Sequence, residues 1–336
     1  MSAKGADVKQ KNIMNKKNIF TTTIMVALLA GIVAFQACQK EGKYNPEQKI
    51  SKIYEDVYEY VSFWDEEMET WDERQEVKYP KQLSEEWIWK DDKLSEISYY
   101  WYIYYNNDIM MFLSTDYYFY KNGRLDKIEH DEESDYTKIT YNGSKYDKFE
   151  YYSDDILWSS AEFSYENDKV SKIVVEQKYI PIYGVPKRDP LSSFIPKEFI
   201  SMMNADLKKT EKGAKWEETS RNQTVYYTYN GDNIKEMKVE IDRFYGYEIF
   251  ETKSWIFNYL SYDNKQNPFY KKTDIDFWGI DYNVFGVTSK NNPLEVSIGF
   301  QRAPNIVYSY KYENDFPVEV EEKQGIYTFK TYYEYK

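Results

Sequence analysis

The chain carries a pattern of aromatic, polar and apolar positions that recurs six times between residues 87 and 320. Each copy places apolar or aromatic residues at alternate positions, follows them with a short polar turn, and then starts a new apolar stretch. The turns are Lys90–Lys93, Lys121–Arg124, Asn142–Gly143, Glu166–Lys169, Asn230–Asp232 and Glu313–Asp315. Alternation separates the two faces of a strand, and Asn, Asp and Gly accept the positive φ of tight turns. The pattern therefore predicts a series of β-hairpins.

These hairpins predict an all-β fold in which each strand pairs with its neighbour in sequence. The expected architecture is an antiparallel meander of hairpins that closes into a soluble β-barrel or forms a strongly curved single sheet, because closure removes exposed sheet edges. Residues 64–80 are acidic and predict a loop or a short helix. Residues 181–215 contain four prolines and predict a long loop with one short helix that caps the barrel.

Residues 1–37 have the layout of a secretory signal peptide. Two lysines precede an uncharged, mostly apolar run of 17 residues (19–35), and Ala37 stands before Cys38, the only cysteine. A transmembrane helix, which is the alternative, needs about 20 apolar residues. We therefore expect cleavage between Ala37 and Cys38.

The rest of the chain then divides simply. Translation is expected to start at Met14, so that the first 13 residues are not part of the signal peptide. A tether of residues 38–48 leads into a single β-rich domain at 49–336, which contains the 181–215 insertion.

Charge and composition exclude several functions. The formal charge is −13, and removal of residues 1–37, with five lysines and one aspartate, brings it to −17. Such an acidic protein repels nucleic acid, so no nucleic-acid partner is expected. Apart from Cys38 the chain has no thiol, and its one histidine, His130, stands among acidic residues. We expect no metal, no cofactor and no catalytic residues, and we interpret His130 as a solvated loop residue.

Two short motifs near Cys38 carry a resemblance. Phe35-Gln36-Ala37-Cys38 resembles the lipobox of bacterial lipoproteins, and Gln39-Lys40-Glu41 resembles the signal that sends Bacteroidetes lipoproteins to the outer face of the outer membrane. The resemblance implies lipidation of Cys38 with several acyl chains, which together hold a protein stably at a membrane. It also implies an outer-membrane, lipid-anchored location with exposure at the cell surface.

Further motifs extend the resemblance over residues 49–336. Tyr118–Leu125 looks like the YD repeat of RHS-type proteins, with Lys121 where Asp is usual. The whole domain resembles a family of Bacteroidetes lipoproteins of unknown function with a porin-like fold. The shared elements are Lys49–Ile53, Leu94–Ile97, Tyr262-Asp263 with Asn267-Pro268-Phe269, and Asn291–Leu294. The family implies a fold and brings no catalytic residues.

The aromatic stretch from Tyr99 to Tyr105 is the strongest candidate binding site. Tyr100, Trp101, Tyr102 and Tyr104 could form a platform on which sugars or peptides stack. The alternative is a strand packed on both faces or an aromatic ladder, and we favour this reading.

Acidic residues offer weaker candidates. Asp274 and Asp276 alternate on a predicted strand, as in paired-carboxylate glycosidases. Asp131–Asp135 and Ser153–Asp155 could ligate calcium, although neither has the spacing of a calcium-binding loop.

Three functions follow from the sequence. The first is a non-enzymatic surface lipoprotein that binds a glycan, peptide or protein or has a structural role, with the membrane as partner through Cys38. The second is a carrier that holds a small ligand inside the barrel. The third is a carboxylate-based glycan-degrading enzyme. An open, aromatic-lined lumen would favour the carrier, and a filled lumen would argue against it.

Overall fold

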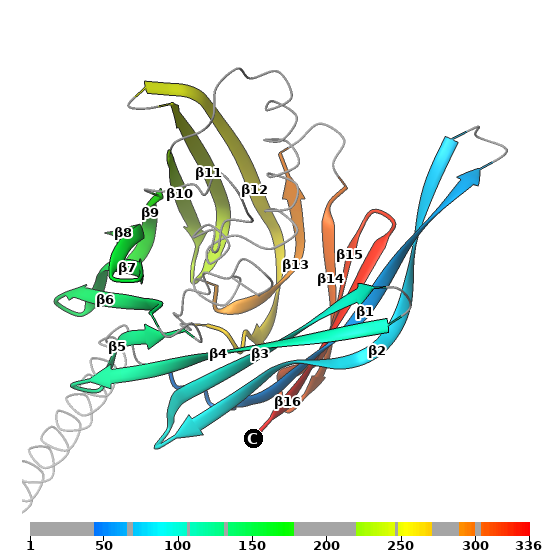
Figure 1. Ribbon diagram of the computed structural model, residues 1–336, viewed down its shortest axis with the longest axis horizontal. Coiled ribbons are helices and arrows are strands. Elements are labelled where there is room, and N and C mark those ends of the chain that lie inside the picture. Colours follow the sequence, from blue (N-terminus) through cyan, green and yellow to red (C-terminus); the bar gives the residue numbers. More distant parts are fainter. Residues whose placement is uncertain are drawn as a thin grey trace, which may run out of the picture. The chain divides into compact units, whose positions relative to one another are not determined.

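The described residues of the protein form a closed antiparallel β-barrel of sixteen strands (Figure 1). The computed structural model describes residues 44–65, 70–105, 108–130, 134–177, 220–245, 248–270, 289–299 and 304–336. Each strand pairs with its neighbour in sequence, and β1 closes the barrel against β16. The strands are β1 (Ile50–Asp65), β2 (Thr70–Lys90), β3 (Lys93–Tyr105), β4 (Asp108–Lys121), β5 (Arg124–Glu129), β6 (Tyr136–Asn142), β7 (Lys145–Ser153), β8 (Ile156–Glu166), β9 (Lys169–Gln177), β10 (Ser220–Asn230), β11 (Asn233–Tyr245), β12 (Glu248–Gln266), β13 (Asn291–Ile298), β14 (Ile306–Glu313), β15 (Phe316–Gln324) and β16 (Tyr327–Tyr335).

The predicted all-β meander is confirmed, and of its two forms the chain adopts the closed barrel. The prediction of a loop or short helix at 64–80 was wrong, because β1 continues to Asp65 and β2 begins at Thr70. These strands form a long ribbon in which Trp64 pairs with Trp71. The helix predicted within 181–215 lies outside the described residues, as do the signal peptide and Cys38.

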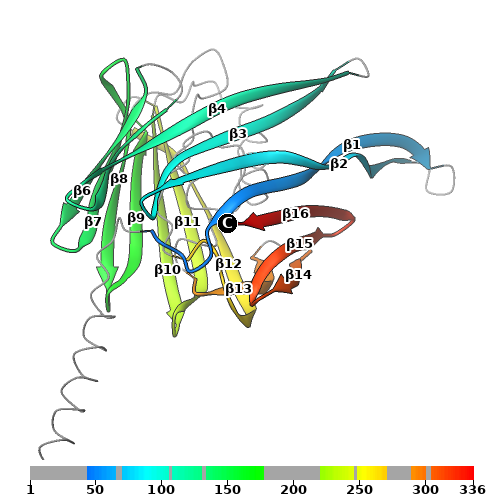
Figure 2. The same cartoon turned by 90° about the horizontal axis from the view of Figure 1, so that it is seen from below.

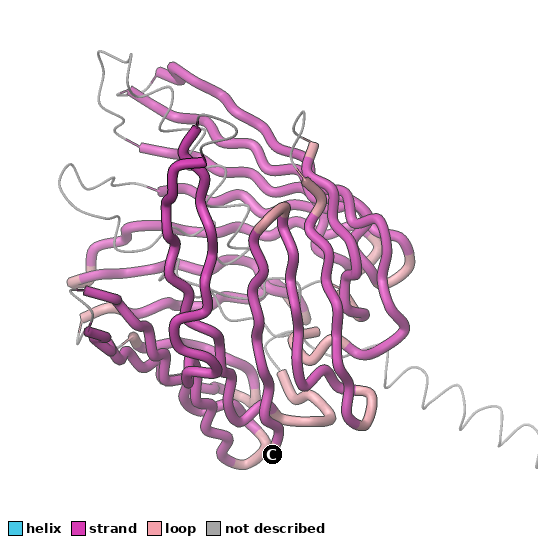
Figure 3. The backbone as a smooth tube through the Cα atoms, turned by 90° about the vertical axis from the view of Figure 1, so that its right-hand side faces the viewer, coloured by secondary structure: helices cyan, strands magenta, loops and turns pink. Residues whose placement is uncertain are grey.

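The barrel has two different ends. All six predicted hairpin turns lie at one end, which we call the turn rim, because every second connection of a meander falls on the same side. The chain also enters and leaves there: the Lys336 N–H donates to the Lys49 carbonyl at 2.8 Å. The tips of the β1–β2 and β3–β4 hairpins lie at the opposite end, which we call the ribbon rim. Figures 2 and 3 show the barrel from two further directions.

A β-bulge after each turn explains the three-residue spacing of apolar positions in the sequence. In the turn between β4 and β5, Tyr120 pairs with Leu125 and Phe119 with Lys127, which leaves Asp126 as the extra residue. The bulge shifts the alternation by one position. Leu125 and Ile128, three residues apart, are consequently both buried.

The wall of the barrel is apolar inside and charged outside. On β11 the side chains of Met237, Val239 and Ile241 are buried in a core to which most strands contribute. The alternate positions face outward, where Lys238 and Glu240 form an ion pair of 2.6 Å. The charge pattern therefore follows the pleat of the strand.

Cationic side chains link successive turns around the turn rim. Arg124 lies 3.4 Å from the centre of the Tyr141 ring and donates to the Gly143 and Ser144 carbonyls at 2.8 and 2.9 Å. The same relation of a turn cation to the next aromatic ring recurs elsewhere: Lys93 lies over Tyr120, Lys145 over Tyr165 and Lys169 over Tyr229.

Candidate functional site

The predicted aromatic platform lies on β3, in the half of the strand nearer the ribbon rim. The Tyr102 hydroxyl donates to the Leu83 carbonyl at 2.9 Å, and the Tyr100 hydroxyl lies 3.5 Å from a Glu86 carboxylate oxygen. Burial raises the pKa of both hydroxyls, and Glu86 raises that of Tyr100 further. These two rings therefore lean towards β2. The side chains of Trp101 and Tyr104 lie outside the described residues, so the platform stays a prediction.

The partner strand of this segment is apolar and exposed. Tyr100 pairs with Leu113 and Tyr102 with Met111. Met111, Phe112 and Leu113 are 56%, 40% and 51% exposed. Successive residues of a strand point to opposite faces. Both faces of the β3–β4 ribbon are therefore accessible at this level.

The interpretation of His130 as a solvated loop residue was wrong, because the side chain is fully buried. Its Nδ1 lies 2.6 Å from Oδ1 of Asp116 on β4, and its Nε2 lies 3.0 Å from Oγ1 of Thr137 on β6. Its backbone N–H donates to the Asp135 carbonyl at 3.0 Å. The partners come from different strands, and the acidic residues that follow His130 in the sequence gave no sign of this enclosure.

A second carboxylate extends the cluster. The Tyr151 hydroxyl donates to Oδ2 of Asp135, and the Tyr151 ring stands edge-on to His130 with 6.0 Å between centroids. Asp116, His130 and Thr137 place a carboxylate, an imidazole and a hydroxyl in sequence. This order of groups can activate the hydroxyl as a nucleophile. Thr137 is 0% exposed, so no substrate can reach its hydroxyl in this state. The arrangement therefore holds strands together.

Of the two calcium candidates, residues 131–133 lie outside the described residues, and the members that are described do not assemble into a site. Asp154 and Asp155 form the turn between β7 and β8, with φ of 50° and 59°. Asp135 instead pairs with Tyr151. The described ranges contain no group of three or more His, Cys, Asp or Glu side chains placed to hold a metal ion. Asp274 and Asp276 lie outside them.

A buried ion pair lies on the inward face of β11 and β12. Arg243 is 3% exposed, and its guanidinium contacts the Glu251 carboxylate at 2.7 Å. Lys253 lies 3.9 Å from the same carboxylate. The interior thus changes from apolar to charged along these two strands.

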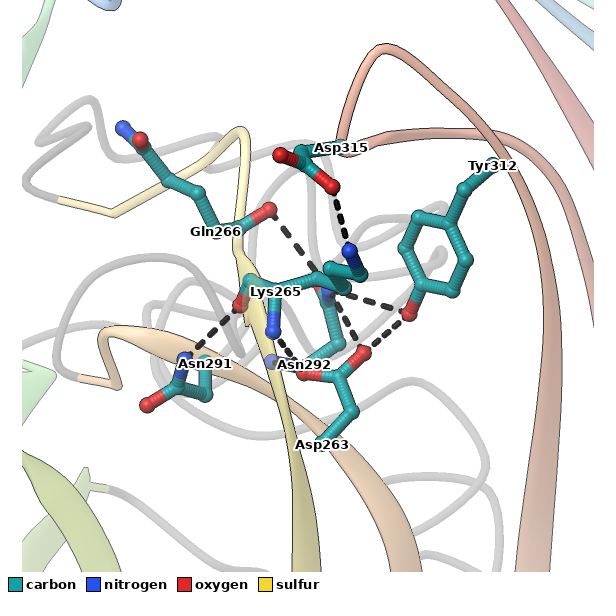
Figure 4. Close-up of polar contacts among 7 residues, drawn as sticks. All are labelled: Asp263, Lys265, Gln266, Asn291, Asn292, Tyr312 and Asp315. Atoms are coloured by element: carbon teal, nitrogen blue, oxygen red, sulfur yellow. Dashed lines mark hydrogen bonds and ion pairs between the residues drawn. The ribbon is translucent and has the colours of Figure 1, made fainter.

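The sequence element Tyr262-Asp263 forms the centre of a polar network at the turn rim (Figure 4). Oδ1 of Asp263 accepts from the backbone N–H of Lys265 at 3.0 Å and from that of Asn292 at 3.1 Å. Oδ2 accepts from the Tyr312 hydroxyl and from the Asn292 amide. Burial and then the Asp263 carboxylate raise the pKa of Tyr312 above its ordinary range. Lys265 reaches on to Asp315 in the turn between β14 and β15.

The neighbouring Asn-Pro-Phe element anchors the segment before β1 to the same region. Oδ1 of Asn267 accepts from the Phe269 N–H at 3.0 Å, which fixes a tight turn. The Tyr44 hydroxyl donates to the next carbonyl, that of Pro268, at 2.6 Å. The Phe269 ring packs against Trp87 with 6.2 Å between centroids. These turns therefore have a structural role.

Comparison with known proteins gives similarity in structure only. No known protein family and no curated protein matches the sequence. Among solved structures, the chain is similar to a porin-like protein from Bacteroides uniformis ATCC 8492, with 8% identity, a TM-score of 0.49, and coverage of 88% of this chain and 100% of that one. It is also similar to a porin-like protein from Bacteroides vulgatus ATCC 8482, with 10% identity, a TM-score of 0.36, and coverage of 86% and 99%.

Proposed function

We propose that this protein is a lipid-anchored, non-enzymatic protein of the bacterial cell envelope, and that its barrel stands outside the bilayer as a binding or structural module. The observation that supports this most directly is the sidedness of the wall. A membrane-spanning barrel has an apolar outer band and a polar interior. Here the outward positions of β11 carry Lys238 and Glu240, and the inward positions carry Val239 and Ile241.

The same sidedness recurs around the barrel. Lys148 and Glu150 form an outward ion pair of 3.4 Å on β7, and Lys323 and Glu321 form one of 2.8 Å on β15. A lysine that faces lipid at the middle of a bilayer costs about 2–4 kcal/mol. Several such residues at mid-strand therefore argue against insertion of this wall. No helix among the described residues is long and apolar enough to cross a membrane.

The entry point of the chain gives the barrel an orientation. Tyr44 is held at the turn rim by its bond to Pro268, and five residues lie between it and Cys38. An extended chain of that length spans at most about 20 Å. An acyl group on Cys38 would thus keep the turn rim close to the membrane, and the ribbon rim would face away from it. Partners would then meet the hairpin tips first.

The two alternatives receive less support. A carrier needs an open lumen, yet inward residues such as Ile53, Ile97 and Val225 are 0% exposed. An enzyme needs reactive groups that a substrate can reach, and the imidazole–hydroxyl pair of His130 and Thr137 is enclosed.

The test separates anchoring by lipid from insertion of the barrel. The full chain is expressed in a bacterium with a lipoprotein pathway and fed an alkyne fatty acid, next to a Cys38→Ala variant. We expect labelling of the wild type and none of the variant. In a third form, a cleavable signal peptide without a lipobox replaces residues 1–38, and this form is expected in the soluble fraction after an alkaline carbonate wash.

Each part of the proposal can fail separately. Labelling of Cys38→Ala would disprove acylation at this residue. Retention of the third form in washed membranes would mean that the barrel itself inserts. The third form removes the ambiguity of Cys38→Ala, in which an uncleaved signal peptide could hold the chain in a membrane.

A further inference from the structure

The β3–β4 hairpin continues past its neighbouring strands as a two-stranded ribbon. β2 pairs with β3 up to Tyr99, and β5 pairs with β4 only from Tyr117 onward. Between these points the ladders of the described residues join β3 and β4 only to each other. Figure 2 shows β3 and β4 as a long ribbon whose tip projects away from the other strands. Among the described residues, no strand therefore pairs with the outer edge of β4 from Asp108 to Asp116.

This edge has little of the usual protection against pairing, because its only charged residues, Asp108 and Asp116, stand at its two ends. Exposed edge strands ordinarily carry charged residues, prolines or bulges that discourage another chain from adding a strand. Residues 97–107 and 109–115 contain no charged residue and no proline. The described pairing of β3 with β4 runs without a register shift from Glu96 to Tyr105.

The β1–β2 ribbon at the same rim provides an internal comparison. It is longer than the β3–β4 ribbon and pairs as far as Asp65 with Thr70. Its distal part is protected in sequence by charged residues and a proline: Glu59, Asp72, Glu73, Arg74, Glu76, Lys78 and Pro80. One protruding ribbon is thus blocked against edge pairing, and the other is not.

The exposed side chains on β4 are apolar, unlike the charged residues of the β1–β2 ribbon. Met111 and Leu113 face one side and are 56% and 51% exposed, and Phe112 faces the other and is 40% exposed. A strand added along β4 would find apolar side chains on both faces of the extended sheet. Burial of such side chains on both faces would add to the main-chain hydrogen bonds.

We propose that this β4 edge pairs with the same edge of a second copy of the chain, so that the two ribbons form one four-stranded antiparallel sheet. The edge is uncharged between Asp108 and Asp116 and is there compatible with itself, whereas most of the outer wall of a protein with a formal charge of −13 would bring like charges together. The added strand would continue the line of β5, which ends at Glu129. The pairing does not depend on acylation of Cys38.

The experiment uses the full chain, expressed in cells with two different epitope tags. A photo-cross-linking amino acid replaces Met111 in one sample and, as the control, Val307 in another. Val307 lies on β14 and is 46% exposed, which matches Met111 closely. We expect a product of twice the chain mass that carries both tags from position 111, and none from position 307.

A second measurement tests the chemistry of the edge. The double variant Met111→Lys/Leu113→Lys should lower co-precipitation of the two tagged copies by about tenfold or more, because each lysine must be desolvated at the edge. Val307→Lys should change it by less than about twofold. The cross-link, which needs no lysine substitution, remains informative if the double variant does not accumulate.

Three outcomes would overturn the proposal. They are co-precipitation that the two lysines do not alter, no cross-linked product from position 111, and a cross-linked product only with a protein of another mass. A cross-linked product only with a protein of another mass would mean that the β4 edge pairs with a different polypeptide. A failure of fatty-acid labelling at Cys38 would leave this result untouched, so the two proposals fail independently.

Discussion

His130 joins three segments of the wall through one side chain. Its ring contacts Asp116 on β4 and Thr137 on β6, and its backbone N–H donates to Asp135. Asp116 lies next to Tyr117, the residue at which β4 begins to pair with β5. The imidazole therefore holds β4 at the point where the β3–β4 ribbon leaves the barrel. Buried hydrogen bonds of this kind cost most when one partner is removed.

The substitution His130→Ala should lower the free energy of unfolding by about 2–4 kcal/mol, because it leaves the buried Asp116 carboxylate without this partner. Urea unfolding followed by tryptophan fluorescence measures the change. Lys138→Ala, at the exposed position next to Thr137, is the control and should stay within about 0.5 kcal/mol. Adding Asp116→Asn to His130→Ala should recover part of the loss. Additive losses in the double variant would contradict the proposed pairing.

At the scale of elements, the hairpin turns were visible in the sequence and their bulges were not. The pairs Leu125/Ile128 and Tyr146/Phe149 were recognisable as apolar positions three residues apart, but a regular strand buries positions two apart. Only the register, with Asp126 and Asp147 as extra residues, explains this difference.

The surroundings of His130 could not be predicted from the sequence for a related reason. Its partners lie on other strands, and single-sequence patterns report local alternation rather than neighbours across a sheet.

The links between successive turns can be tested at Arg124. Arg124→Ala removes a stacked cation and two hydrogen bonds to the next turn, so it should destabilise the barrel by about 1–2 kcal/mol. Arg124→Lys keeps the charge but cannot make both guanidinium hydrogen bonds, so an intermediate loss of stability is expected. Lys121→Ala, an exposed position at the other end of the same turn, is the matched control for urea unfolding. Equal effects of Arg124→Ala and Lys121→Ala would mean that the link contributes nothing.

At the scale of the whole molecule, the tyrosines explain how an acidic chain fills a wide barrel. Sixteen strands enclose a large interior, and tyrosine supplies bulk together with a hydroxyl that can bond a main-chain carbonyl. The Tyr229 hydroxyl donates to the Val170 carbonyl at 2.7 Å, and that of Tyr262 donates to Ile234 at 2.8 Å. Both acceptors are the first apolar residue after a repeat turn. The rings thus connect neighbouring hairpins from inside, while most charges lie on the outer wall and the Arg243–Glu251 pair is an inward exception.

Burial of these hydroxyls predicts a loss of stability at alkaline pH. Desolvation raises the pKa of Tyr227, Tyr259 and Tyr310 well above the ordinary tyrosine value of about 10. Above that pH the unfolded chain releases protons that the folded chain retains, so the free energy of unfolding must fall as the pH rises, by about 1.4 kcal/mol per pH unit for each such tyrosine. Urea unfolding between about pH 8 and about pH 11, with tyrosinate absorbance recorded in parallel, measures this slope. Tyr310→Phe should make the slope shallower by about one proton, at the expense of the bond to Pro293. A free energy of unfolding that stays constant over this range, or tyrosines that ionise fully while the barrel remains folded, would show that the hydroxyls are not enclosed by the fold.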